Sequence, residues 1–138
     1  MISVRKQEVV KLEDVLHLYQ AVGWTNYTHQ PQMLEQSLSH SLAIYLALDG
    51  DAVVGLVRLI GDGFSSVFVQ DLIVLPSYQR QGIGSDLMKE ALGDYKDAYQ
   101  VQLATEQTEK TLGFYRSLGF ETLSTYDCTG MIWVDRKK

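Results

Sequence analysis

Two glycines that follow an apolar stretch are the residues of this sequence best placed to do chemistry. Leu72–Val74 is apolar, Pro76 follows it, and Gly82 and Gly84 stand where a helix is predicted to begin. Because glycine has no side chain, backbone N–H groups there can approach an oxygen atom of a ligand closely. The first N–H groups of a helix have no partner inside it, and the helix dipole adds partial positive charge. The segment therefore predicts an anion site that suits a diphosphate without a metal ion.

Other glycine-rich motifs fit this segment less well. A P-loop requires Lys-Ser or Lys-Thr directly after its last glycine, and neither Gly82 nor Gly84 is followed by that pair. The dinucleotide motif Gly-x-Gly-x-x-Gly would need a third glycine where Leu87 stands. A strand-to-helix turn without a ligand is also open, although two glycines weaken a helix start unless something uses the exposed amides.

The spacing of Gln79, Gly82 and Gly84 resembles motif A of the GNAT family, the acetyl-CoA-dependent N-acetyltransferases. The motif is short, and its context makes it specific. A predicted strand precedes it, a helix with an apolar stripe follows it, and Gly-Phe-Tyr-Arg-Ser-Leu-Gly-Phe at 113–120 matches a second segment of the family. The stripe consists of Leu87, Met88, Ala91 and Leu92.

The resemblance implies acetyl-CoA as the cofactor and CoA as the product. The strand before the motif would bind the pantetheine arm through its main chain, and the following loop and helix start would surround the diphosphate. Arg80 would add a positive charge there, or would be a solvated turn residue. Thr108 stands where many family members have a cofactor-contacting asparagine, and it reaches less far. The implied pantetheine residues are Leu72, Ile73 and Val74, and the diphosphate residues are Gln79, Arg80, Gln81, Gly82, Ile83, Gly84 and Ser85.

The resemblance also implies which groups would move protons when acetyl passes from a thioester to an amine. Tyr115 matches the family position whose hydroxyl acts as general acid near the CoA sulfur, although its spacing also fits a half-buried core ring. A backbone N–H of residues 72–74 would meet the oxyanion. Asp71 and Glu106 each lie beside a predicted strand end, and either could accept the amine proton or be a solvated or ion-paired carboxylate.

Hydrophobic periodicity and turn signals place these residues on strands and helices. Asp49-Gly50 is a strong hairpin signal, and Gly23 and Gly119 are well placed to end helices. The predicted strands are 2–5, 42–48, 52–60, 66–74, 101–105, 120–126 and 131–135, and the predicted helices are 11–22, 31–38, 82–95 and 108–118.

This order of elements indicates an α/β (mixed α+β) chain with a mixed, mostly antiparallel sheet flanked by about four helices. It matches the GNAT fold from one end to the other, which implies a single N-acetyltransferase domain over residues 1–138.

The polar and aromatic loop 23–30 precedes the second predicted helix. In GNAT proteins this loop lies over the acceptor side of the cleft. Trp24 and Tyr27 would therefore line an acceptor pocket, or, as aromatic rings more often do, pin the loop to the core.

Charge and cysteine content limit the classes of partner. The chain carries 12 Lys and Arg against 17 Asp and Glu, a net charge of −5, which argues against a sequence-independent hold on nucleic acid or on a membrane. The single cysteine, Cys128, allows no intrachain disulfide, and a cytoplasmic location is expected. Three histidines without close pairing and one cysteine predict no metal site.

Two functions stay open at this point. The first is transfer of acetyl from acetyl-CoA to a primary amine of a small molecule or peptide, by direct attack in a ternary complex. The alternative is a non-catalytic module that binds acetyl-CoA or CoA as a sensor or regulator. Tyr115 favours the enzyme, because a pure binder needs no acid near the sulfur. An apolar edge around Trp133, together with family habit, also suggests a homodimer.

Overall fold

A computed structural model describes residues 1–134 of the chain, which falls into two compact units, Met1–Leu103 and Ala104–Lys138. The first unit contains β1 (Ile2–Gln7), α1 (Leu12–Ala21), α2 (Thr25–Thr28), α3 (Pro31–Ser39), β2 (Ala43–Asp49), β3 (Ala52–Gly61), β4 (Ser66–Val74), a 3₁₀ turn (Pro76–Tyr78), α4 (Ile83–Asp94) and β5 (Gln100–Leu103). The second unit contains α5 (Glu109–Ser117) and a 3₁₀ turn (Leu123–Tyr126).

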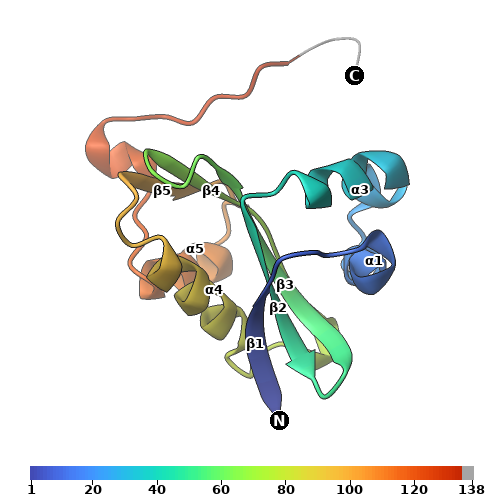
Figure 1. The fold of residues 1–138 in the computed structure, drawn as a ribbon. Helices are drawn as coiled ribbons and strands as arrows, with labels where there is room; N and C mark the ends of the chain where they lie inside the picture. The colour runs from blue at the N-terminus through green and yellow to red at the C-terminus, as the bar shows by residue number, and fades with distance from the viewer. Residues whose placement is uncertain (135–138) are drawn as a thin grey trace. The chain divides into compact units, whose positions relative to one another are not determined.

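The first unit is built on a five-stranded mixed sheet with the strand order β1-β2-β3-β4-β5 (Figure 1). Neighbouring strands from β1 to β4 run antiparallel, and β5 runs parallel to β4. The three successive antiparallel strands predicted for residues 42–74 are confirmed. Gly50, at the β2–β3 turn, has a φ of 61°, a conformation that favours glycine.

Helices cover both faces of this sheet (Figure 1). On one face, buried side chains of α1, α2 and α3 form a single apolar cluster with β2, β3 and β4. On the other face α4 approaches β3 closely, because a Cβ on Gly55 would lie only 3.2 Å from the side chain of Leu87. The strand residues in the first cluster are Ile44, Leu46, Leu56 and Ile73, and the buried residues of α4 are Ile83, Leu87, Met88 and Ala91.

A β-bulge interrupts the ladder between β3 and β4. Arg58 pairs with Asp71 and Leu59 pairs with Val69, so that Gln70 has no partner on β3. The extra residue changes which side chains of β4 face the α1 side of the sheet. Val69 and Asp71, two positions apart, therefore face opposite sides.

The predicted final hairpin is wrong for the described residues. Residues 123–126 form a 3₁₀ turn instead of a strand, and residues 127–134 contain no strand. Asp127 has a φ of 57°, and the N–H of Cys128 donates to the carbonyl oxygen of Leu123 over 3.0 Å, so the chain turns back where a strand would extend. Residues 131–134 favour β structure by type, and none of them lies in a strand. Residue 135, the last of the predicted hairpin, lies outside the described residues.

Candidate active site

The loop after β4 presents a row of backbone N–H groups. Arg80 has a φ of 65° and Gly82 a φ of 81°, both in the left-handed region. The first bond of α4 runs from the N–H of Asp86 to the carbonyl oxygen of Gly82, over 2.9 Å. Within residues 1–134, no protein acceptor takes the N–H groups of residues 80–85. Such a row of amides at a helix start is suited to an anion.

On the edge of β4 that faces β5, no strand of the described residues pairs with the second half of β4, and this stretch is called the open edge below. β5 pairs with β4 only from Ser66 to Val69. The N–H of Leu75 donates to the carbonyl oxygen of Val54 on β3, over 2.9 Å. Because main-chain groups alternate between the two edges of a strand, those of Leu72 and Val74 point to the open edge. An extended ligand can therefore bind there as an added strand would.

The predicted cofactor residues lie in this loop and along this edge, and their side chains differ in how far they are buried. Gln79 donates from Nε2 to the carbonyl oxygen of Val74 over 3.0 Å, so its side chain already covers part of the open edge. The side chain of Ile83 is buried under the sheet, which leaves only its N–H for a ligand. The side chain of Ile73 is also buried, on the α1 side. Arg80, Gln81 and Gly82 are exposed, and Leu72, Val74, Gly84 and Ser85 are partly buried.

Asp71 lies immediately before this open edge and is almost completely buried, at 3% exposure. Its Oδ2 accepts from Nε of Arg58 and from the hydroxyl of Tyr19, both over 2.8 Å. Its Oδ1 accepts from the hydroxyl of Tyr27 over 2.9 Å. Of the roles predicted for Asp71, the ion-paired carboxylate is the one observed. A carboxylate with three strong donors is poorly suited to take a proton from a substrate.

Asp71, Arg58, Tyr19 and Tyr27 form a buried polar cluster, in which Arg58 was not predicted from the sequence. Arg58 is 4% exposed, and its guanidinium also donates to Tyr27 over 3.1 Å and to Ser41 over 3.2 Å. Burial lowers the pKa of Arg58, but the neighbouring Asp71 outweighs that effect and raises it. The signal was present in the sequence as two opposite charges within two consecutive apolar strands.

The aromatic residues of loop 23–30 pin the loop to the core. Tyr27 sits on the short helix α2, is 7% exposed, and packs its ring 5.0 Å from that of Tyr19. Trp24 is partly buried, with its ring 6.1 Å from that of Tyr19 and 6.4 Å from that of Tyr27. Trp24 is thus the more accessible of the two predicted acceptor residues.

The second unit carries the other three predicted residues. Tyr115 is partly buried between the rings of Phe114 and Phe120, at centroid distances of 5.0 and 5.9 Å, and burial raises its pKa. Thr108 caps α5, where its Oγ1 accepts from the N–H of Thr111 over 3.2 Å. Glu106 is exposed in the segment before α5.

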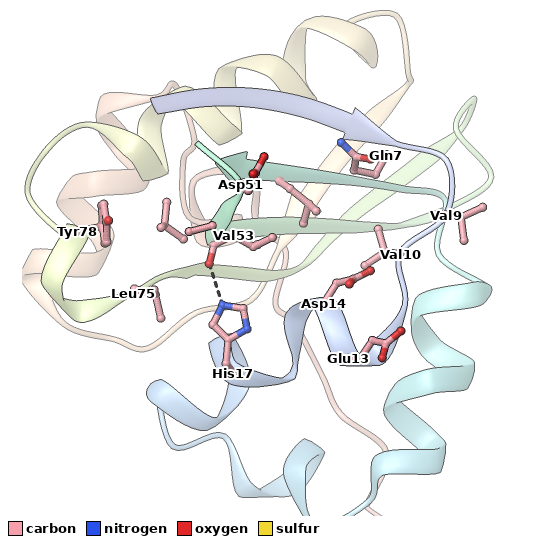
Figure 2. Close-up of a pocket in the computed structure, with 13 residues that line it drawn as sticks. Gln7, Val9, Val10, Glu13, Asp14, His17, Asp51, Val53, Leu75 and Tyr78 are labelled. Atoms are coloured by element: carbon pink, nitrogen blue, oxygen red, sulfur yellow. Dashed lines mark hydrogen bonds between the residues drawn. The ribbon is translucent and has the colours of Figure 1, made fainter. Parts of the chain in front are cut away.

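A pocket of about 520 Å³ lies between the end of β1, the start of α1 and the β2–β3 turn (Figure 2). His17 donates from Nε2 to the carbonyl oxygen of Val53 over 2.8 Å at its wall. Leu75 also lines the pocket, which therefore adjoins the end of β4 nearest the diphosphate loop and not the bulge at Gln70. The charged lining residues are all acidic: Glu13, Asp14 and Asp51.

Among the described residues, no helix is both long and apolar enough to cross a membrane.

The family model for the acetyltransferase (GNAT) domain matches residues 40–122, which is more than half of the chain and includes the loop, the open edge and Tyr115. The chain belongs to the GNAT family. It is an enzyme of the N-acetyltransferase type.

This GNAT chain is similar to one acetyltransferase of about its own length and to others that are longer. A GNAT-family acetyltransferase from Streptococcus pneumoniae TIGR4 is 82% identical, with a TM-score of 0.92 over 99% of both chains. GCN5-related N-acetyltransferase 1, chloroplastic, from Arabidopsis thaliana is 28% identical over 97% of this chain and 68% of its own length. A GNAT-family acetyltransferase from Elizabethkingia anophelis with acetyl-CoA bound has the same fold, at 21% identity and a TM-score of 0.65 over 87% of this chain and 76% of that chain. GNAT neighbours of this chain thus bind acetyl-CoA.

Proposed function

We propose that this GNAT enzyme transfers the acetyl group of acetyl-CoA to a primary amine of a small molecule or peptide, by direct attack in a ternary complex. The observation that carries the proposal is the row of amides at residues 80–85, which have no protein acceptor among residues 1–134 and lie directly after the open edge of β4. The two features are continuous in the chain, and they suit a diphosphate joined to an extended pantetheine arm.

The amides and the charge of Arg80 fit a diphosphate without a metal ion. Several backbone N–H groups converge at the start of α4, where the helix dipole favours negative charge. Gly82 keeps this approach clear, because a Cβ is absent and its left-handed φ suits the turn. The main-chain groups of Leu72 and Val74 would bind the amides of the arm.

Bound acetyl-CoA would supply the activated acetyl group. Residues of the chain would stabilise the negative charge that develops on its oxygen and would donate and accept protons. The free N–H of Leu72 or Val74 would donate to the oxygen on which negative charge develops. Tyr115 would give its proton to the departing sulfur. A tyrosine hydroxyl is protonated at neutral pH and can therefore donate; burial raises the pKa of Tyr115, which keeps the proton in place and also makes the hydroxyl a weaker acid.

We assign the base to Glu106, acting directly or through water, and not to Asp71. Glu106 is exposed and can exchange protons with solvent. Asp71 already accepts from Arg58 and two tyrosines, and protonating it would break a buried ion pair.

The experiment that tests this function combines binding and turnover. Acetyl-CoA should raise the melting temperature in a concentration-dependent way, because it binds the native state. Thiol release should then be followed with a panel of tryptamine, spermidine, free lysine and a glycine-initiated tripeptide. Release with at least one amine would support the enzyme. Binding without release would leave a cofactor sensor, and no thermal shift would contradict both functions.

Self-association and a cytoplasmic location are further proposals. Met131 and Ile132 are 95% and 86% exposed, which is unusual for large apolar side chains and suits burial against a second copy. Sedimentation velocity would test the homodimer. The cytoplasmic location rests on the single, exposed Cys128.

A further inference from the structure

Helix α2 belongs to the loop predicted to lie on the acceptor side, and β4 is the strand predicted to bind the cofactor. The two are joined by a buried hydrogen bond between Tyr27 and Asp71. α2 has four residues and no side-chain cap, so it is too short to be stable by itself. Its one fully buried side chain is Tyr27, whose hydroxyl reaches Oδ1 of Asp71 on β4. The position of α2 therefore depends on this contact and on ring packing with Tyr19 and Trp24.

Asp71 sits where small displacements would matter most for the reaction. It follows the bulged residue Gln70 and precedes Leu72, whose main-chain groups point to the open edge. The arm would run from the diphosphate loop along Val74 towards Leu72, which places the acetyl end near the bulge. Gln70 is exposed there, with Nε2 3.4 Å from the hydroxyl of Tyr27.

Stability alone gives little reason for this polar cluster. A buried ion pair pays a desolvation cost that roughly cancels its attraction, so apolar residues of similar size often stabilise a fold as well or better. The cluster instead fixes the relative positions of three elements, because each of the three donors to the Asp71 carboxylate comes from a different one. Tyr19 comes from α1, Tyr27 from α2 and Arg58 from β3.

We propose that Asp71 is a positioning residue that holds α2, through Tyr27, at a fixed place beside the acetyl end of the cofactor strand. The inference rests on the proposed function and deepens it. α2 and Trp24, its N-cap residue, then form the acceptor side of the site, while the acidic pocket beside Leu75 does not. Asp71 acts through Tyr27 and touches neither acetyl-CoA nor the acceptor.

Two single substitutions separate this role from a purely structural one. Tyr27→Phe and Tyr19→Phe each remove one hydroxyl from the same carboxylate and keep the aromatic ring. Only Tyr27 lies on α2. Tyr27→Phe should lose at least as much stability as Tyr19→Phe, because the Tyr27 hydroxyl also accepts from Arg58. Tyr27→Phe should also speed amide hydrogen exchange in residues 24–29, and raise KM for the amine with the fastest thiol release in the panel by about tenfold. Its acetyl-CoA Kd should change by less than about twofold.

Tyr19→Phe should leave the exchange of residues 24–29 and the amine KM within about twofold of wild type. Asp14→Asn, which removes an acidic group from the pocket, should leave the amine KM unchanged as well. The inference would be overturned if Tyr27→Phe and Tyr19→Phe changed the amine KM equally, or if neither changed it. The proposed function would still stand as long as wild type released thiol. If wild type releases thiol with no amine of the panel, the proposed function fails and takes the inference with it.

Discussion

Arg58 and Asp71 pair across β3 and β4 at the last register position before the bulge, with Nε of Arg58 2.8 Å from Oδ2 of Asp71. Their side chains are 5% and 2% exposed, so both charges have left water. This ion pair connects the fold to the proposed chemistry, because the residue after Asp71 begins the open edge.

Breaking this pair from one side should destabilise the protein strongly. We expect Asp71→Asn to lower the free energy of unfolding by about 3–5 kcal/mol, because it leaves the charge of Arg58 buried without a counterion. Urea unfolding measures this loss. Asp97→Asn, at an exposed position, should cost less than about 0.5 kcal/mol. The double variant Arg58→Met/Asp71→Leu should recover most of the loss, and a double variant no more stable than Asp71→Asn would contradict the account.

Alkaline pH should destabilise the fold through its buried tyrosines. Burial and the neighbouring Asp71 raise the pKa of Tyr19 and Tyr27 above the ordinary value of 10.0. A raised pKa in the folded state means that the stability contributed is complete below pH 10 and is lost as pH rises through the folded pKa. The free energy of unfolding should therefore fall above pH 10.

Tyr19→Phe is the control for this effect, because it removes one ionisable hydroxyl from the cluster. Its free energy of unfolding should fall less steeply than that of wild type between pH 9.5 and 11. Identical slopes for the two proteins would show that Tyr19 does not contribute to the pH dependence.

Tyr115→Phe should separate turnover from cofactor binding. Loss of a general acid costs about 10²–10⁴-fold in rate. We expect kcat to fall within that range while the acetyl-CoA Kd stays within about twofold, as measured by thiol release and calorimetry. Because burial raises the pKa of Tyr115 above its ordinary value of 10.0, deprotonation of this hydroxyl should not reduce wild-type activity at any pH up to 10. Phe114→Leu, at the neighbouring ring, should retain most of the rate. Unchanged turnover in Tyr115→Phe would remove the acid role.

Glu106→Gln tests the assigned base. We expect kcat/KM at pH 7 to drop by about 10²-fold, and to recover partly at higher pH as more of the amine is already neutral. Glu109→Gln is a matched control, since Glu109 is also an exposed carboxylate, in the first turn of α5. The assignment would be contradicted if kcat/KM fell in Asp71→Asn and recovered at higher pH, while Glu106→Gln left kcat/KM unchanged. Asp71 would then be the base.

Local patterns predicted most of the elements in the first unit. The Asp49-Gly50 turn and the apolar stripe after Gly84 are each set by residues close together in the chain, and each is observed. Composition misled at residues 131–134, because β propensity says only that a residue suits a strand and not that a partner strand exists.

Features that depend on long-range geometry were missed. The Arg58–Asp71 pair requires the β3–β4 register, and the bulge at Gln70 shifts that register by one residue. The contact between Tyr27 and Asp71 spans 44 positions and depends on how α2 lies on the sheet. The left-handed turn at Gly82 follows more directly from the sequence, because glycine readily adopts a positive φ.

The central claim is that the amides after β4 hold the diphosphate of acetyl-CoA, and calorimetric titration of acetyl-CoA into wild type, Gly82→Ala and Gly50→Ala tests it most directly. Gly82 and Gly50 both have a left-handed φ, and neither would place a Cβ within 4 Å of another group, so the backbone cost of alanine should be similar, about 1–2 kcal/mol. We predict that Gly82→Ala weakens acetyl-CoA binding about tenfold, the equivalent of about 1.4 kcal/mol, while Gly50→Ala binds like wild type. Equal affinities for all three proteins, or no binding by wild type, would contradict the claim.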